Sequence, residues 1–178
     1  FNKMNARAAK TAAKVAFPDL EESVIDEALI DFRGSWRRFE YRGETPRGAQ
    51  VYDDYAHHPT AIDKTVVAAR EKFPGKRIVV AFHPHLYSRT KSFFEDFALV
   101  LARTDRTYIA PIYAAREAPD PDISSDILAD RSRDLGGDVE SLPTFDAIRE
   151  ALLEEDENTV IITMGAGDIY KVAEQIAD

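Results

Sequence analysis

The sequence contains no cysteine, which excludes disulfides, a thiolate metal site and a cysteine nucleophile. It also has no apolar run that approaches a membrane span and no segment typical of a signal peptide, so membrane insertion is not expected. Basic residues are outnumbered, because 23 lysines and arginines stand against 32 acidic residues and give a formal net charge of −9. Phosphate backbones require a basic surface, so nucleic acid is not the expected main partner. We therefore expect a soluble, cytoplasmic protein.

The chain has enough apolar residues for a proper core. Its 178 residues are 44% hydrophobic and 31% charged, which is typical of a globular domain and not of a disordered segment. The length suits one domain, or one domain and a piece of another. The opening, "FNKMNARAAKTAAKVAF", has no initiator methionine and reads as a helix that is already in progress. We expect the chain to be part of a longer protein.

Hydrophobic periodicity divides the sequence into two parts. Two helices are expected at residues 2–17 and 20–32, and the alternation in "WRRFEYRG" predicts a strand at residues 36–43. Five strand–helix units follow, with strands expected at residues 50–52, 77–82, 106–110, 138–142 and 159–164. The helices between and after them are expected at residues 59–73, 91–101, 124–135, 145–153 and 169–177. This order predicts an α/β domain with a mainly parallel sheet and helices on both faces.

Polar motifs follow four of the predicted strands. They read "DDYAHHP", "HPHLYSRT", "PIYAAREAPD" and "GAGD" in chain order. Ligands of open α/β sheets bind beyond the carboxyl ends of the strands, where these four loops are expected to meet. The glycine-rich "GAGDIYKVA" is either a tight turn or an anion-binding helix start. No G-x-x-x-x-G-K-[ST] loop occurs, so a phosphate-binding loop for ATP would lie outside this chain.

Acids and arginines in these loops allow two interpretations each. Asp53 and Asp54 are either a solvated loop with a helix cap, or include a carboxylate that holds a ribose hydroxyl or a metal. Arg89 and Arg116 are either surface residues or bidentate partners of a carboxylate or phosphate. The spacing alone does not decide between these interpretations.

The four histidines do not predict a metal site. His57 and His58 are adjacent, so their side chains diverge, and the simplest interpretation is one capping and one exposed histidine. His83 and His85 could approach a common ion, but Pro84 lies between them and a third ligand is missing, which disfavours zinc.

Taken together, these segments resemble the Mur ligases of peptidoglycan synthesis, in particular the members that join L-alanine to UDP-N-acetylmuramate. "FNKMNARAA" is similar to that group's HNxxNAxAA, "WRRFEYRG" to its RRFE segment and "YDDYAHHPTAI" to its DDYxHHPTE motif. "FHPHLYSRTKSFFEDFA", "IYAAREAP" and "MGAGDIYKVA" are similar to FQPHRYTRTRxxxxDFA, IYPAREAP and GAGDI. The resemblance covers essentially the whole chain in the family's order.

The resemblance implies a domain organisation and a reaction. Residues 1–45 correspond to the tail of a central ATP-binding domain, and residues 46–178 to a C-terminal Rossmann-like, three-layer domain that delivers the amino acid. ATP phosphorylates the muramate carboxylate, and the amine of L-alanine then attacks the acyl phosphate. The phosphate loop and the Mg²⁺ ligands are expected in the rest of the Mur ligase chain. Residues 1–178 alone are therefore expected to be inactive.

The resemblance also implies two groups of binding residues. The first contacts the adenine, the phosphates and the ribose of ATP: Asn2 and Asn5, Arg38, and Asp54, respectively. The second lines the amino-acid side, with its arginines on the carboxylate: His57, His58, Arg89 and Arg116. No catalytic residue and no metal ligand is assigned within the chain. Leu86 replaces an arginine that many members have, and His83 replaces the usual glutamine.

Two alternatives remain at this stage. The murein peptide ligase of cell-wall recycling adds a peptide instead of alanine, and "YDDYAHHPTAI" fits it equally well. The other segments fit the alanine-adding members better. A phosphoacceptor signalling domain also places an acid pair after its first strand, but it requires an acceptor Asp after the third strand and a Lys after the fifth. Those positions read "PIYAA" and "GAGD" here.

Overall fold

The computed structural model describes residues 2–32 and 34–177, which form two compact units divided between Ser35 and Trp36. The first unit is a pair of helices, α1 (Asn2–Ala16) and α2 (Glu22–Asp31), in the two places that the sequence predicts. Lys10 links them through ion pairs to Glu22 and Asp26. No helix in the described part of the chain is long and apolar enough to cross a membrane.

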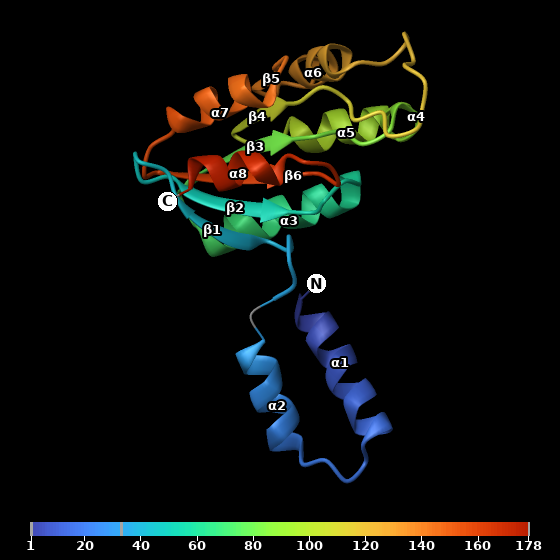
Figure 1. The fold of residues 1–178 in the computed structure, drawn as a ribbon, viewed down its shortest axis with the longest axis vertical. Coiled ribbons are helices and arrows are strands. Elements are labelled where there is room, and N and C mark those ends of the chain that lie inside the picture. The colour runs from blue at the N-terminus through green and yellow to red at the C-terminus, as the bar shows by residue number, and fades with distance from the viewer. Residues whose placement is uncertain (1, 33, 178) are drawn as a thin grey trace. The chain divides into compact units, whose positions relative to one another are not determined.

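The second unit is built on one six-stranded sheet (Figure 1). Its strands are β1 (Glu40–Glu44), β2 (Gln50–Asp54), β3 (Arg77–Phe82), β4 (Arg106–Ile109), β5 (Val139–Ser141) and β6 (Thr159–Met164). They lie in the order β1-β2-β6-β3-β4-β5, and every neighbouring pair except β1 with β2 is parallel. The predicted α/β class and mainly parallel sheet are confirmed.

Helices cover both faces of this sheet. A separate hydrophobic core lies on each side of the sheet. One core contains residues of α3 (Pro59–Lys72), α5 (Phe94–Leu101) and α6 (Ser125–Asp134), and the other contains residues of α7 (Phe145–Leu153) and α8 (Tyr170–Ile176). Alternate residues of β3 point to opposite faces of the sheet, so Ile78 and Val80 lie in the first core and Val79 and Ala81 lie in the second. Strands buried on both faces explain the continuous apolar runs in the sequence.

Two predicted elements are corrected by the structure. The helix predicted at residues 91–101 is two helices, α4 (Tyr87–Ser92) and α5, because the backbone leaves the helical conformation at Phe93. The strand predicted at residues 36–43 begins only at Glu40. Arg37 and Phe39 have φ angles of 55° and 51°, a left-handed conformation that a strand does not accommodate.

The boundary between the units falls earlier than residue 45, where the sequence places a domain boundary. β1 pairs with β2 along residues 40–44, and this pairing joins the strand to the second unit. The assignment of residues 1–45 to the tail of an ATP-binding domain remains a prediction.

Candidate functional site

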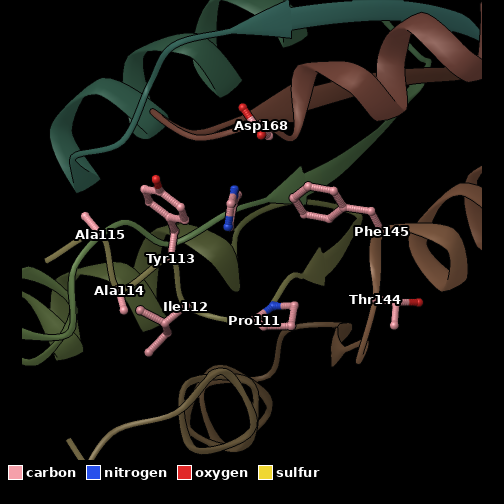
Figure 2. A pocket seen from close by; sticks show the side chains of 9 residues that line it. Pro111, Ile112, Tyr113, Ala114, Ala115, Thr144, Phe145 and Asp168 are labelled. Atoms are coloured by element: carbon pink, nitrogen blue, oxygen red, sulfur yellow. The ribbon is translucent and has the colours of Figure 1, made fainter. Parts of the chain in front are cut away.

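A cavity of about 490 Å³ lies at the carboxyl ends of the parallel strands, as the sequence predicts for this fold (Figure 2). Its lining comes from four segments: His83 after β3, residues 111–115 after β4, Thr144 and Phe145 at the start of α7, and Asp168 after β6. Three of these segments belong to the loops that the sequence singles out. The fourth segment, Thr144 and Phe145, was not among the loops expected from the sequence. Thr144 is the N-cap of α7, and its hydroxyl accepts a hydrogen bond from the Ala147 amide. A threonine at the start of a predicted helix is the signal that could have found it.

The imidazole of His83 is buried at this cavity between two aromatic rings. Its ring centroid lies 5.0 Å from that of Phe145 and 5.7 Å from that of Tyr113. Nδ1 has no hydrogen-bond partner among the described residues and packs against Gly167, where an added Cβ would lie 2.6 Å away. Burial lowers the pKa of His83 to about 4, although the negative charge of Asp168 opposes the shift. The imidazole is therefore neutral at physiological pH.

The buried His83 predicts a loss of stability in mild acid. An unfolded histidine titrates near pH 6.5, whereas folded His83 has a pKa of about 4. As pH falls between these values, the unfolded chain binds a proton that the folded chain does not, so the free energy of unfolding decreases. Denaturant unfolding at pH 7 and pH 4.5 should show that His83→Gln removes roughly 1–3 kcal/mol of the acid sensitivity of the parent protein. Equal acid sensitivity in both proteins would contradict this environment for His83.

The acid pair at the end of β2 is buried and differently bonded. Asp53 is 1% exposed and accepts hydrogen bonds from Arg37 Nε at 2.6 Å and from Thr163 Oγ1 at 2.6 Å. Arg37 is itself 2% exposed and also donates to the carbonyls of Gly165, at 2.7 Å, and Gly167, at 3.0 Å. The solvated-loop interpretation is therefore wrong for Asp53. Sequence reasoning missed Arg37, because nothing in "RRFE" shows which arginine points inward.

Asp54 is also buried, but it has no guanidinium partner. Its Oδ2 accepts the backbone amide of Phe39 at 2.8 Å, and its Oδ1 accepts that of Ala56 at 2.7 Å. Burial raises the pKa of Asp54, and the two amide hydrogen bonds and the charge of Arg38 oppose that shift. A carboxylate has about four acceptor positions, so Asp54 keeps further acceptor positions after binding both amides.

The other residues predicted to bind ATP have fewer described contacts than Asp54. Arg38 is exposed, and no ion pair or hydrogen bond of its side chain occurs in the described part of the chain. Asn5 is exposed on α1, in the other compact unit. The side chain of Asn2 lies outside the described part of the structure. Within the second unit, the structure brings Arg38 and Asp54 together through the Phe39 amide.

The adjacent histidines diverge, as expected from their spacing. His57 is half-buried, and its Nδ1 lies 2.8 Å from the carbonyl oxygen of Tyr55. His58 caps α3, because its Nδ1 accepts the Thr60 amide at 3.3 Å, and its ring packs edge-on against Phe93. His58 thus has the predicted capping role, whereas the expectation of an exposed second histidine is wrong, because His57 is half-buried. Neither histidine lines the cavity.

The two segments that carry the predicted carboxylate-binding arginines, the loop after β4 and helix α4, are joined by a hydrogen bond. Glu117 accepts the Ser88 amide at 3.0 Å, which links the loop after β4 to the start of α4. Arg116 is exposed next to this link. Arg89 is half-buried on α4, and its positive charge adds to burial in lowering the pKa of His85. Among residues 2–32 and 34–177, no group of three or more His, Asp or Glu side chains could hold a metal ion.

Comparison with known proteins gives consistent matches. The family model "Mur ligase, glutamate ligase domain" matches residues 37–167. A UDP-N-acetylmuramate–L-alanine ligase of Lachnospira eligens is 43% identical over 98% of this chain, and one of Thermobifida fusca is 40% identical over 99%. The chain spans 38% of the length of each of these two relatives.

Solved structures agree with the sequence matches. A UDP-N-acetylmuramate–alanine ligase of Thermotoga maritima superposes with a TM-score of 0.77 at 29% identity, covering 98% of this chain and 36% of its own. A murein peptide ligase of Psychrobacter arcticus gives a TM-score of 0.64 at 22% identity, covering 98% of this chain and 37% of its own. The second likeness concerns the fold alone.

Proposed function

The chain belongs to the Mur ligase family, and from this premise we propose that it is part of a cytoplasmic, ATP-dependent ligase that joins L-alanine to UDP-N-acetylmuramate. The observation that carries the proposal is the 43% identity, over 98% of this chain, to a relative with that name. No specific feature of the described residues favours a peptide over alanine as the incoming amine.

The proposed reaction forms one amide at the expense of one ATP. ATP supplies the phosphoryl group that converts the muramate carboxylate into an acyl phosphate, with ADP as the other product. The amine of L-alanine attacks the acyl carbon, the phosphate leaves and the amine loses a proton. The residues of this chain bind and orient the reactants, and we place the phosphate loop and the Mg²⁺ ligands in the rest of the enzyme.

Arg38 and Asp54 have the properties that binding of the nucleotide requires. Arg38 has an exposed guanidinium, which is suited to phosphate oxygens. Asp54 lies close to it, because the Asp54 carboxylate accepts the amide of Phe39, the residue that follows Arg38. The remaining acceptor positions of Asp54 suit a ribose hydroxyl. We propose Asn2 and Asn5 for the adenine on the family resemblance alone.

We assign the binding of the incoming amino acid to segments that follow β2, β3 and β4. We propose that Arg116 and Arg89 bind the carboxylate of L-alanine, with His57 and His58 beside it. Support comes from the hydrogen bond between Glu117 and Ser88, which joins the loop that carries Arg116 to the helix α4 that carries Arg89. Leu86 occupies the position of a further arginine in many relatives, so Arg116 is expected to contribute most.

Arg116→Lys in the complete enzyme is expected to raise the KM for L-alanine about tenfold or more and to leave the KM for ATP within roughly a factor of two. Lysine keeps the charge but cannot form the planar, two-point fork of a guanidinium on a carboxylate. Steady-state kinetics with each substrate varied in turn measures both constants. A parallel rise of both constants would contradict the assignment of Arg116 to the amino acid.

Phosphate release by the complete enzyme tests the proposed function. Release should require UDP-N-acetylmuramate, ATP and an amine donor together, with L-alanine preferred over other amino acids and over peptides. Release with a peptide but not with L-alanine would identify the murein peptide ligase reaction instead. Absence of release with any amine would contradict both ligase functions.

A further inference from the structure

Arg37 joins three segments that are distant in the sequence. Its guanidinium donates to the Asp53 carboxylate at the end of β2, and to the carbonyls of Gly165 and Gly167 in the loop after β6. Its own backbone lies in the turn before β1, near the start of the second compact unit. A buried guanidinium with a carboxylate and two carbonyls as partners has its charge and most of its donors satisfied.

Aromatic rings enclose the same guanidinium. Its central carbon lies 4.8 Å from the ring centroid of Tyr170, 5.2 Å from that of Tyr55 and 5.7 Å from that of Trp36. The negative faces of such rings stabilise a cation. Hydrogen bonds and aromatic rings together thus define the position of the Arg37 guanidinium closely.

The backbone around Arg37 is fixed as tightly as its side chain. The Arg37 amide donates to Glu40 Oε2 at 2.8 Å, and its carbonyl accepts the Tyr55 amide at 2.7 Å. Two residues later, the Phe39 amide donates to Asp54 at 2.8 Å. The intervening residue is Arg38, which is exposed and has no partner of its own in the described part of the chain.

The positive φ angles on both sides of Arg38 also indicate that the contacts around Arg37 fix this turn. Arg37 and Phe39 have φ angles of 55° and 51°, which cost non-glycine residues roughly 1–2 kcal/mol each. Such conformations persist where the surrounding contacts impose them. The described contacts do so, and their consequence is that the Arg38 side chain projects outward beside Asp54.

We propose that Arg37 is a positioning residue for nucleotide binding: its buried contacts with Asp53, Gly165 and Gly167 fix the turn that presents Arg38 and Asp54 to ATP. This inference rests on the proposed function, because it gives Arg38 and Asp54 their ligand. It assigns Arg37 no contact with the nucleotide. Lysine carries its donors on a single nitrogen, so it cannot reach the carboxylate and both carbonyls as the three nitrogens of Arg37 do.

The test uses the complete enzyme and a non-hydrolysable ATP analogue. Arg37→Lys should weaken analogue binding about tenfold, with the KM for L-alanine changed less than about twofold. Arg37→Met combined with Asp53→Asn removes both buried charges, so no unpaired charge remains, and it should also weaken analogue binding. Arg70→Met is the matched control, because Arg70 likewise bridges a carboxylate and a carbonyl, those of Asp105 and Arg103, ahead of β4. It should leave analogue binding unchanged.

Coupling between Arg37 and Arg38 separates positioning from a general loss of structure. In the parent enzyme, Arg38→Ala should weaken analogue binding about tenfold, whereas in the Arg37→Lys background the further loss should be less than about threefold. Thermal unfolding shows whether each variant is folded. Full additivity of the two changes, or a folded variant of Arg37 with the parent affinity, would overturn the proposal. If the parent enzyme itself failed to ligate L-alanine, the proposed function would be the part that is wrong.

Discussion

Asp53→Asn is expected to lower the free energy of unfolding by about 3–5 kcal/mol. The substitution changes the volume of the side chain little, but it leaves the Arg37 guanidinium buried without a counter-charge. Arg37 and Asp53 are 2% and 1% exposed, so water cannot replace the lost partner. Urea unfolding of the parent and variant proteins, followed by circular dichroism, measures the difference.

Asp54→Asn is the matched control for Asp53→Asn. Asp54 is also buried, but its oxygens accept two backbone amides and no arginine. The amide side chain can still accept one of these hydrogen bonds, so the expected loss is roughly 1–3 kcal/mol. A loss at Asp54 equal to or greater than that at Asp53 would contradict the view that the Arg37–Asp53 pair is the principal buried charge contact of this edge.

Gly165→Ala is expected to have an effect of similar size, about 2–6 kcal/mol of unfolding free energy, by a different mechanism. Gly165 has a φ angle of 147°, and an added Cβ would lie 2.6 Å from the backbone oxygen of His83. The backbone conformation costs roughly 1–3 kcal/mol for other residues, and the overlap adds about 1–3 kcal/mol. Because the obstacle is backbone and not a flexible side chain, the structure cannot easily relax around it.

Gly75→Ala separates the two contributions. Gly75 has a φ angle of 84° with nothing within 4 Å of the added Cβ, so only the conformational cost of roughly 1–2 kcal/mol applies. Unfolding experiments on the two variants should therefore rank Gly165→Ala well above Gly75→Ala. Equal losses would mean that the loop after β6 does not pack against His83 as described.

The sequence predicts most of this fold because its apolar pattern is strong. β3, β6 and α7 begin and end where the periodicity indicates, since each is bounded by polar or turn residues. The strand predicted at residues 36–43 is wrong at Arg37, because an alternation of aromatic and basic residues is also compatible with a turn that contains left-handed residues. Conformation there depends on Asp53, Gly165 and Gly167, which are distant in the sequence and leave no local signal.

The location of the candidate site was more predictable than its side-chain geometry. Parallel strands bring their carboxyl ends to one edge, so the loops containing His83 and Asp168 were expected to meet. Periodicity does not show which member of Arg37 and Arg38 points inward, or that Asp53 takes an arginine while Asp54 takes amides. The ligand contacts of all eight predicted site residues remain predictions from the family resemblance: Asn2, Asn5, Arg38, Asp54, His57, His58, Arg89 and Arg116.

Product analysis in a competition experiment tests the central claim most directly. The complete enzyme would be supplied with UDP-N-acetylmuramate, ATP, and equal concentrations of L-alanine and an L-alanine-initiated peptide, and the products would be identified by mass spectrometry. We predict UDP-N-acetylmuramoyl-L-alanine as the dominant product, formed with one ADP and one phosphate per amide. A dominant peptide adduct, or an amide formed without ATP consumption, would contradict it.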